Sequence, residues 1–141
     1  KIFNPDNAYF GEKDFQQLLL IKTLTEQLDI KTNVVGCETI REPDGLAMSS
    51  RNKLMSDKER KSAKEIIKLL LWAKEAYSKF DFIQIRDEIK NRSKLIDSFK
   101  LEYFEIMNLE KFSSISKKNN ETRAFIACRI GNIRLIDNIK L

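Results

Sequence analysis

Hydrophobic residues recur at helical spacing near the start of the chain. In residues 14–28 (DFQQLLLIKTLTEQL), apolar side chains return every three or four positions, at Phe15, Leu18, Ile21, Leu24 and Leu28. This spacing predicts an amphipathic helix with one buried face. Residues 32–40 (TNVVGCETI) form a short β-branched run, which predicts a buried strand. A helix followed by a buried strand is typical of the last unit of a parallel α/β sheet.

Turn-forming residues separate this unit from a second helical region. Residues 41–55 (REPDGLAMSSRNKLM) contain Pro43, Gly45 and a pair of serines, which predict a loop. Ser56 and Glu59 then match a capping box, a pair of side chains that opens many helices. The apolar stripe of this helix consists of Ala63, Ile66, Ile67, Leu70, Ala73 and Tyr77.

A further helix precedes a strand-rich end. Asp81 is placed to cap a helix that runs to about Ser98, with Phe82, Ile85, Ile89 and Ile96 facing inward. Residues 101–107, 123–130 and 133–139 are rich in β-branched and aromatic residues and predict strands. Gly131 and Asn132 separate the last two strands, as in a two-residue hairpin. Residues 111–122, with many Lys, Ser and Asn, predict a mobile loop. The pattern therefore divides near residue 47 into the tail of an α/β layer and a small α+β unit.

Composition narrows the class of protein. Of 141 residues, 42% are hydrophobic and 33% charged, a globular, soluble profile. No apolar run reaches the ~20 residues of a membrane helix. Two cysteines far apart, Cys37 and Cys128, favour a reducing cytoplasm over a disulfide scaffold. The chain contains no histidine, which excludes His-based triads, His general bases and His-containing zinc sites within these residues.

Positive charge is concentrated in the second part of the chain. The net charge is +5, and residues 61–141 hold 17 Lys and Arg against 11 Asp and Glu. A basic region of this kind is compatible with binding to nucleic acid or to a polyanionic ligand. The simpler interpretation is a solvated Lys-rich surface, because Lys, Asn and Ile are abundant throughout. We therefore expect neither a nucleic-acid partner nor a membrane.

The first segment with candidate chemistry runs from Tyr9 to Gln17 (YFGEKDFQQ). Gly11 directly precedes the predicted helix, and Lys13 and Asp14 lie in its opening turn. A helix start holds anions, and a lysine there makes sense if a phosphate binds beside it. The alternative is an Asp14 that merely caps the helix next to a solvated Lys13, and spacing alone favours it.

The second segment runs from Asp44 to Asn52 (DGLAMSSRN). Ser49, Ser50 and Arg51 supply two hydroxyls and a planar fork of donors that suit phosphate oxygens. The alternative, again favoured by composition alone, is a local turn at the serines with Arg51 in a surface salt bridge. Neither segment is a Walker A loop or a GxGxxG motif. Lys, Arg and Ser point to stabilisation of charge on a phosphoryl group rather than to proton transfer.

Three stretches together resemble the pantothenate synthetase (pantoate–β-alanine ligase) family. They are YFGEKDFQQL at 9–18, REPDGLAMSSRN at 41–52 and RIGNIRLIDNI at 129–139, in the family's order and spacing over essentially the whole chain. MSSR stands where this family has its version of the KMSKS loop of class I aminoacyl-tRNA synthetases. The resemblance implies ATP-dependent ligation of pantoate and β-alanine through pantoyl adenylate, with Mg²⁺ accompanying ATP, in a cytoplasmic homodimer.

The resemblance also implies roles for individual residues. Those expected to contact ATP are Gly11, Glu12, Lys13, Asp14, Ile40, Met48, Ser49, Ser50 and Arg51. Lys13 would contact phosphate, Gly11 and Asp14 would lie near the ribose, and the Ile40 backbone would meet adenine. Gln17 matches a glutamine that binds pantoate, and Lys13, Ser49, Ser50 and Arg51 would carry the catalysis. No metal ligand is expected among the chain's own side chains.

One departure from the family shapes the expected architecture. The family carries an HxGH-type motif in its N-terminal half, whereas this chain has no histidine. We therefore expect the last helix–strand unit of a Rossmann-like α/β nucleotidyltransferase domain at 1–47. An α+β C-terminal lid domain is expected at 48–141, starting with the KMSKS-like loop. The 141 residues alone would be a C-terminal half and inactive. The rival hypothesis is a non-catalytic module of the same fold that binds nucleic acid or serves in assembly.

Overall fold

The chain folds into two compact units, Lys1–Ile40 and Arg41–Leu141. The computed structural model describes residues 3–108, 113–114 and 122–141. The boundary lies between Ile40 and Arg41, before the expected position near residue 47. Arg41 explains the difference, because it forms an antiparallel bridge with Ala47 and a paired hydrogen bond with Asp137. The segment 41–47 is therefore bonded into the second unit.

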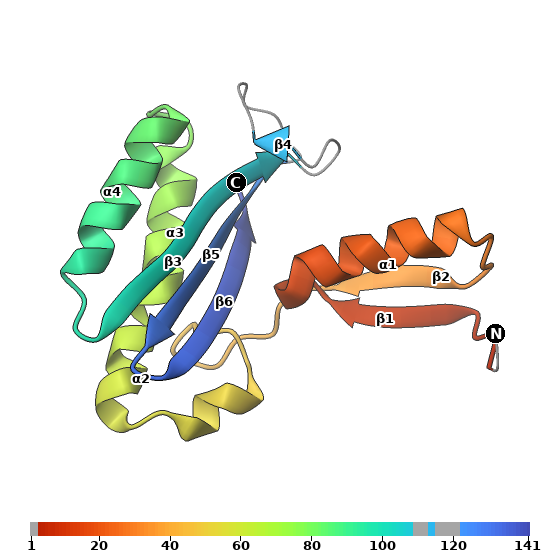
Figure 1. Ribbon diagram of the computed structural model, residues 1–141, viewed down its shortest axis with the longest axis horizontal. Coiled ribbons are helices and arrows are strands. Elements are labelled where there is room, and N and C mark those ends of the chain that lie inside the picture. Colours follow the sequence, from red (N-terminus) through yellow and green to blue (C-terminus); the bar gives the residue numbers. More distant parts are fainter. Residues whose placement is uncertain (1–2, 109–112, 115–121) are drawn as a thin grey trace. The chain divides into compact units, whose positions relative to one another are not determined.

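The first unit is a β–α–β unit with two parallel strands (Figure 1). Strand β1 (Asn7–Gly11) leads through a 3₁₀ turn, η1 (Glu12–Asp14), into α1 (Phe15–Gln27), and β2 (Asn33–Cys37) follows. The parallel register runs from Asn7 beside Asn33 to Gly11 beside Cys37. The predicted helix and strand are confirmed, and the parallel pairing fits the predicted α/β layer. Sequence reasoning missed β1.

Helix α1 packs closely on the sheet near its start and is more exposed towards its end. Phe15 and Leu18 are buried, whereas Leu24 and Leu28 of the predicted stripe are 44% and 55% exposed. A Cβ on Gly36 would lie 3.0 Å from Leu18 Cδ2, so a larger residue here would force the Leu18 side chain to shift. The prediction that β2 is fully buried is wrong: its three central residues are half-buried and its ends exposed.

Over its described residues, the second unit combines three α-helices and a 3₁₀ helix with a four-stranded antiparallel sheet. Its elements are η2 (Ser50–Leu54), α2 (Asp57–Ala63), α3 (Glu65–Ala76), α4 (Phe82–Lys94), β3 (Phe99–Asn108), β4 (Ser113–Ser114), β5 (Thr122–Ile130) and β6 (Ile133–Lys140). The strand order is β4-β3-β5-β6. The prediction that residues 41–55 are only a loop is wrong, because Ser50–Leu54 form a 3₁₀ helix.

Both long helical segments begin with a capping box. Ser56 and Glu59 cap α2 as predicted, and Asp81 caps α4 together with Gln84, a partner that sequence reasoning overlooked. The first predicted helix is interrupted at Lys64, which divides it into α2 and α3. The second ends at Lys94, earlier than expected, because the chain turns through Ser98, which has a positive φ of 57°.

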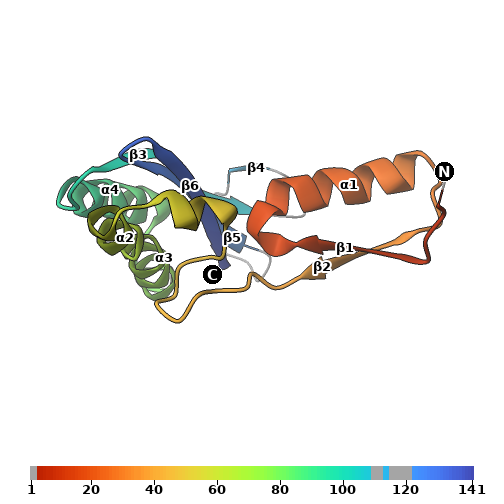
Figure 2. The same cartoon turned by 90° about the horizontal axis from the view of Figure 1, so that it is seen from below.

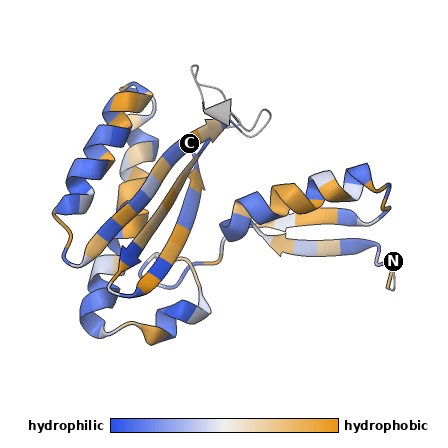
Figure 3. Ribbon diagram, in the orientation of Figure 1, coloured by the Kyte–Doolittle hydropathy of each residue, from blue (hydrophilic) through white to orange (hydrophobic). Residues whose placement is uncertain are grey.

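The core of the second unit lies between the helices and the sheet. Helix α3 packs on β5 and β6 and α4 on β3, and two views show both helices beside the sheet (Figures 1 and 2). Both the helices and strand β5 contribute fully buried side chains to this core. The helices contribute Ile66, Leu70, Ile85 and Ile89, and β5 contributes Ile126, Cys128 and Ile130. Helix α4 is mostly hydrophilic over its length, as expected of a helix with only one buried face (Figure 3).

The predicted hairpin between the last two strands is confirmed. Ile130 pairs with Ile133, so Gly131 and Asn132 form a two-residue turn. Gly131 has a φ of +56°, a backbone conformation that favours glycine. The predicted mobile loop at 111–122 lies largely outside the described residues. Of its described positions, Ser113 and Ser114 form β4 against Met107 and Asn108.

Both cysteines are free thiols, in contrasting places. Cys37 is exposed at the end of β2, whereas Cys128 is buried in β5. Burial raises the pKa of the Cys128 thiol to about 12, so this side chain serves as a small apolar core residue. Over the part of the chain that the structure describes, no helix has the length and apolar character needed to cross a membrane.

The Arg41–Asp137 pair should contribute more stability than an exposed ion pair. Asp137 is almost completely buried, so Asp137→Asn leaves the guanidinium without its charged partner. We expect the free energy of unfolding to fall by about 3 kcal/mol, measured by urea denaturation. The matched control is Asp97→Asn, which breaks the exposed Lys58–Asp97 pair and should change stability little. Equal effects of the two substitutions would contradict the anchoring role of Arg41.

Candidate functional site

The first half of the candidate site lies where β1 passes into α1. Gly11 is the last residue of β1 and is exposed, and a Cβ placed on it would meet no described atom within 4 Å. Glu12, Lys13 and Asp14 form the 3₁₀ turn that follows. Glu12 and Lys13 are half-buried, while Asp14 and Gln17 are exposed. The segment thus presents an open glycine and a lysine directly before a helix start.

Asp14 occupies the N-cap position of α1 but does not cap the helix. Its side chain makes no capping hydrogen bond, and its backbone (φ −95°, ψ 58°) departs from the extended conformation typical of a capping residue. The alternative in which Asp14 is an ordinary cap is therefore wrong. The Asp14 side chain therefore supplies no capping hydrogen bond to the helix start, while its negative charge still lies near the positive end of the helix dipole.

Ile40 lies close to the same end of the sheet. The parallel register places Gly11 beside Cys37, and Ile40 follows Cys37 by three residues with a side chain that is 70% exposed. Ligands of α/β sheets bind outside the carboxyl ends of parallel strands. Gly11, the η1 turn and Ile40 follow the carboxyl ends of β1 and β2, which is where such a ligand would bind.

The second half of the candidate site is the segment Met48–Arg51. Met48 is 54% exposed. Ser49 is the N-cap of η2, and its Oγ accepts a hydrogen bond from Arg51 N at 3.3 Å. The local-turn alternative is thus correct for Ser49. The Arg51 Nη1 donates to the Arg134 carbonyl on β6 at 3.0 Å. Among the described residues Arg51 makes no ion pair, so the structure gives the salt-bridge alternative no support there.

Sequence reasoning missed the side chains that hold this segment in place. Asn52 Nδ2 donates to the Ala47 carbonyl at 3.1 Å and also to Glu42. Arg60 on α2 pairs with both Glu42 and Asp44. All but Arg60 lie in the stretch that carried the family resemblance, yet their roles depend on contacts between positions distant in sequence, which spacing does not reveal.

The same bonds shift the pKa values of the groups involved. Hydrogen bonds from Asn52 and then Arg60 lower the pKa of Glu42. The Glu42 and Asp44 carboxylates raise the pKa of Arg60. For Asp44, burial acts to raise the pKa, but hydrogen bonds from the Leu46 backbone and Arg60 outweigh it, and the pKa is lowered. All three groups are therefore charged at neutral pH, and the cluster stays paired.

Arginines in the second unit are largely neutralised by neighbouring glutamates. Arg129 and Arg134 both bond to Glu102, which sits at an irregularity in β3. Arg86 pairs with Glu105 and Arg92 with Glu88. In each pair a carboxylate lies beside the guanidinium, so these four arginines are not isolated cations, while the net charge of the region is unchanged.

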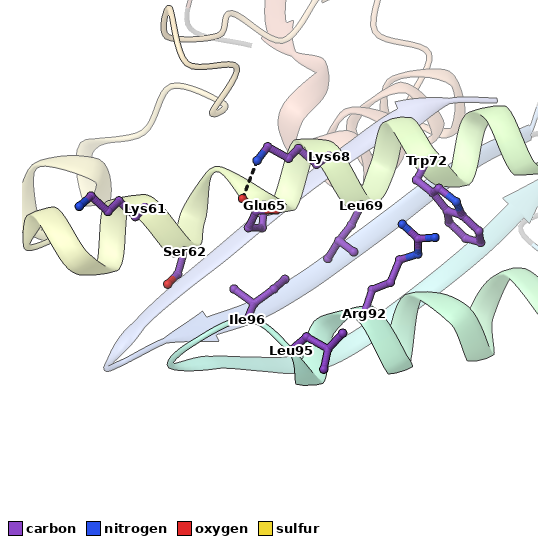
Figure 4. A pocket seen from close by; sticks show the side chains of 9 residues that line it. All are labelled: Lys61, Ser62, Glu65, Lys68, Leu69, Trp72, Arg92, Leu95 and Ile96. Carbon is purple, nitrogen blue, oxygen red and sulfur yellow. Dashed lines mark hydrogen bonds and ion pairs between the residues drawn. The ribbon is translucent and has the colours of Figure 1, made fainter.

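A hollow of about 540 Å³ on the second unit contains none of the candidate residues. It lies along α3 and the end of α4, with Leu69 and Ile96 among its apolar lining (Figure 4). Its charged lining is mostly paired, since Lys68 bonds to Glu65 and Arg92 stacks over the Trp72 ring at 4.4 Å. The hollow is not part of the candidate site.

The structure assembles the candidate residues as two groups. Gly11, Glu12, Lys13, Asp14, Gln17 and Ile40 belong to the first unit, and Met48, Ser49, Ser50 and Arg51 belong to the second. Among the described residues, no group of three or more His, Cys, Asp or Glu is placed to hold a metal ion. The chemistry available to both groups is the binding of anions by Lys, Arg, hydroxyls and backbone N–H groups.

Comparison with known proteins identifies the relatives of this chain. A family model for pantoate-beta-alanine ligase matches residues 1–140. The pantothenate synthetase of Sulfurihydrogenibium sp. (strain YO3AOP1) is 45% identical over 148 residues, covering 99% of this chain and 52% of that protein. The pantothenate synthetase of Flavobacterium psychrophilum is 41% identical over 143 residues, covering 100% of this chain and 51% of that protein. The chain thus spans about half the length of the curated relatives it matches.

Solved structures give the same result. Pantothenate synthetase from Thermus thermophilus matches with a TM-score of 0.90 and 34% identity, over 96% of this chain and 50% of that one. A second match is pantoate-beta-alanine ligase from Francisella tularensis, complexed with beta-gamma ATP and beta-alanine. Its TM-score is 0.64 and its identity 34%, over 99% of this chain and 45% of that chain. The resemblance noted in the sequence is confirmed, and the chain belongs to the pantoate–β-alanine ligase family.

Proposed function

We propose that this chain supplies ATP- and pantoate-binding residues to an enzyme that joins (R)-pantoate to β-alanine with consumption of ATP. Family membership supports the reaction. The observation that carries the assignment of the site is the uncapped start of α1, where Lys13 follows an open Gly11 at the end of a parallel strand. Such a helix start binds phosphate through backbone N–H groups and dipole.

The two units correspond to two functional parts in this proposal. The β–α–β unit is the end of a Rossmann-like domain that binds ATP and pantoate. The second unit is a lid whose KMSKS-like segment is Met48–Arg51. The segment 41–47, assigned from sequence to the first domain, is bonded to the lid instead. Closure of such a lid would bring Ser49, Ser50 and Arg51 onto the phosphates and exclude water from the adenylate.

The first step forms pantoyl adenylate. A carboxylate oxygen of pantoate attacks the α-phosphorus of ATP, and the bond to the bridging oxygen of pyrophosphate breaks. Negative charge builds on the phosphoryl oxygens and on the leaving pyrophosphate. Lys13, Arg51 and the Ser49 and Ser50 hydroxyls donate to these oxygens, which lowers the energy of the transition state. No general base is needed, because the attacking carboxylate is already ionised at neutral pH.

The second step releases the product. The β-alanine amine attacks the acyl carbon of pantoyl adenylate, the bond to the AMP oxygen breaks, and AMP leaves with the electron pair. The attacking amine then loses a proton to give pantothenate. The cations that bound the phosphates also stabilise the departing AMP. Exclusion of water matters here, since water would otherwise hydrolyse the adenylate.

The remaining residues would orient the substrates. Gly11 and Asp14 would lie beside the ribose, with Glu12 in the same turn. Asp14 is exposed and makes no capping bond, which leaves its carboxylate available for this role. The Ile40 backbone would contact adenine. Gln17 lies one turn into α1 and would bind pantoate. Met48 would precede the phosphate-binding hydroxyls at the start of the lid segment.

Mg²⁺ would accompany ATP and supply charge neutralisation at its phosphates. No group of three potential ligands occurs among the described residues, which fits a Mg²⁺ bound mainly through phosphate oxygens and water. The family resemblance further supports a cytoplasmic homodimer. The match to the ligase family over residues 1–140 favours the ligase over a nucleic-acid-binding module.

Arg51 is expected to act on adenylate formation rather than on pantoate binding. In an active enzyme that contains this chain, Arg51→Ala should lower kcat for pantoate-dependent pyrophosphate release by about 10²–10³-fold with little change in the pantoate KM. Lys53→Ala is the matched control, because Lys53 is an exposed cation on the same 3₁₀ helix. Equal loss of kcat and of pantoate affinity would count against this role.

Lys13 is expected to contribute to ATP binding. ATP should raise the melting temperature of the wild-type enzyme, and Lys13→Ala should abolish most of that increase because a charged contact to phosphate is lost. Lys22→Ala removes an exposed lysine further along α1 and should leave the increase intact. A Lys13→Ala protein that ATP stabilises as well as the wild type would argue for a structural Lys13.

The 141 residues alone are expected to form no pantothenate. They contain no histidine, so any donors of the family's HxGH-type motif are missing from the phosphate site. The measurement is pantothenate formation by the purified polypeptide with ATP, Mg²⁺, pantoate and β-alanine. An enzyme that contains both the HxGH-type motif and this chain should form pantothenate under the same conditions. Turnover by the 141 residues themselves would refute the expectation.

A further inference from the structure

Asn52 closes the segment that carries the candidate phosphate ligands. Its Nδ2 donates to the carbonyl of Ala47 at 3.1 Å, across the four residues Met48–Arg51. Its backbone N–H donates to the Ser49 carbonyl at 3.0 Å. Both ends of the segment are therefore fixed to each other through one side chain, while Met48 and Ser50 occupy solvent-exposed positions.

The carboxamide of Asn52 is itself held from the other side. Its Nδ2 also donates to Glu42 Oε1, and the second oxygen of Glu42 bonds to Arg60 on α2. Arg60 in turn bonds to Asp44 at 2.8 Å. A continuous chain of charge-assisted hydrogen bonds thus links the phosphate-binding segment to a helix whose Ser62 and Ala63 are buried.

The two groups that accept hydrogen bonds from the Asn52 side chain, the Glu42 carboxylate and the Ala47 carbonyl, both require an amide donor. Asn52 is only 6% exposed, and its Oδ1 is buried without a hydrogen bond from any described residue. A buried acceptor left unpaired costs stability. Packing alone would favour an apolar side chain here, so the two bonds donated by Nδ2 are the reason for a carboxamide at this position.

We infer that Asn52 is a positioning residue for adenylate formation: it sets the geometry of Ser49–Arg51 by tying Ala47 to Glu42. The inference rests on the proposed function of Ser49, Ser50 and Arg51. Asn52 touches none of the reacting atoms in this scheme. It acts by holding donors where charge develops, and misplacement of such groups by about 1 Å lowers rates by roughly 10²-fold.

The test uses two substitutions in an active enzyme that contains this chain. Asn52→Asp keeps the shape but replaces the donor with an acceptor facing the Glu42 carboxylate, and Asn52→Ala removes the carboxamide without adding charge. Both should lower kcat for pantoate-dependent pyrophosphate release by about 10–10²-fold. The pantoate KM should stay within about twofold, because the pantoate contact Gln17 lies in the first unit.

A control with matched loss of stability separates positioning from folding. Asp81→Ala removes the capping box of α4 and lowers stability at a place distant in sequence from the segment, so it should leave kcat unchanged. Hydrogen exchange gives a readout independent of turnover. The Met48–Asn52 amides should exchange roughly tenfold faster or more in Asn52→Ala than in the wild type, whereas Asp81→Ala should leave them unchanged.

Each outcome decides between the possibilities. A lower kcat with unchanged pantoate KM and faster exchange at Met48–Asn52 supports positioning. An active wild type whose Asn52 variants keep kcat, or lose it only as far as Asp81→Ala does, overturns this inference and leaves the proposed function intact. A wild-type enzyme that releases no pyrophosphate from ATP and pantoate overturns the proposed function and this inference with it.

Discussion

The second unit depends on the pairing of Arg41 with Asp137. The two terminal guanidinium nitrogens of Arg41, Nη1 and Nη2, donate to the two carboxylate oxygens of Asp137 at 2.7 and 3.0 Å, and Nη1 also donates to the Gly45 carbonyl. One side chain thus joins the first residue of the unit to its last strand and closes the turn at 42–46. Because the Asp137 carboxylate is buried, removing either partner would leave the other charge uncompensated and would lower the stability of the fold. The joint fixes the start of the segment, whose far end is held by Asn52.

The candidate site inherits different kinds of rigidity from its two units. In the first unit, the backbone sets the position of the candidate residues. The parallel strands bring Gly11 beside Cys37, and Leu18 of α1 packs closely against Gly36 of β2. In the second, position comes from side-chain bonds, since Met48–Arg51 lie between the joint at Arg41 and the carboxamide of Asn52.

Sequence patterns predicted the fold well wherever local chemistry determines it. Ser56 with Glu59 and Gly131 with Asn132 are local signals, and the helix start and hairpin they predict are present. Strand β1 was missed because NAYFG is short and ends in glycine, and only its pairing with β2 makes it a strand. The helix break at Lys64 and the unit boundary at Arg41 also depend on contacts distant in sequence, which periodicity does not contain.

The candidate site shows the same division between local and distant information. Residue types and family resemblance pointed to Lys13 and Ser49–Arg51, because lysine, arginine and hydroxyls carry the chemistry of phosphate binding. The residues that hold Ser49–Arg51, which are Glu42, Asn52 and Arg60, were not predicted, because a carboxylate, an amide and a guanidinium in a loop and a helix have no distinctive spacing. Their importance follows from burial and bonding: Asn52 retains an unpaired buried oxygen, a cost that only the two bonds of its amide nitrogen offset. Groups that contact a ligand can thus be recognised by their chemistry, whereas groups that place them become visible only once the fold brings their partners together.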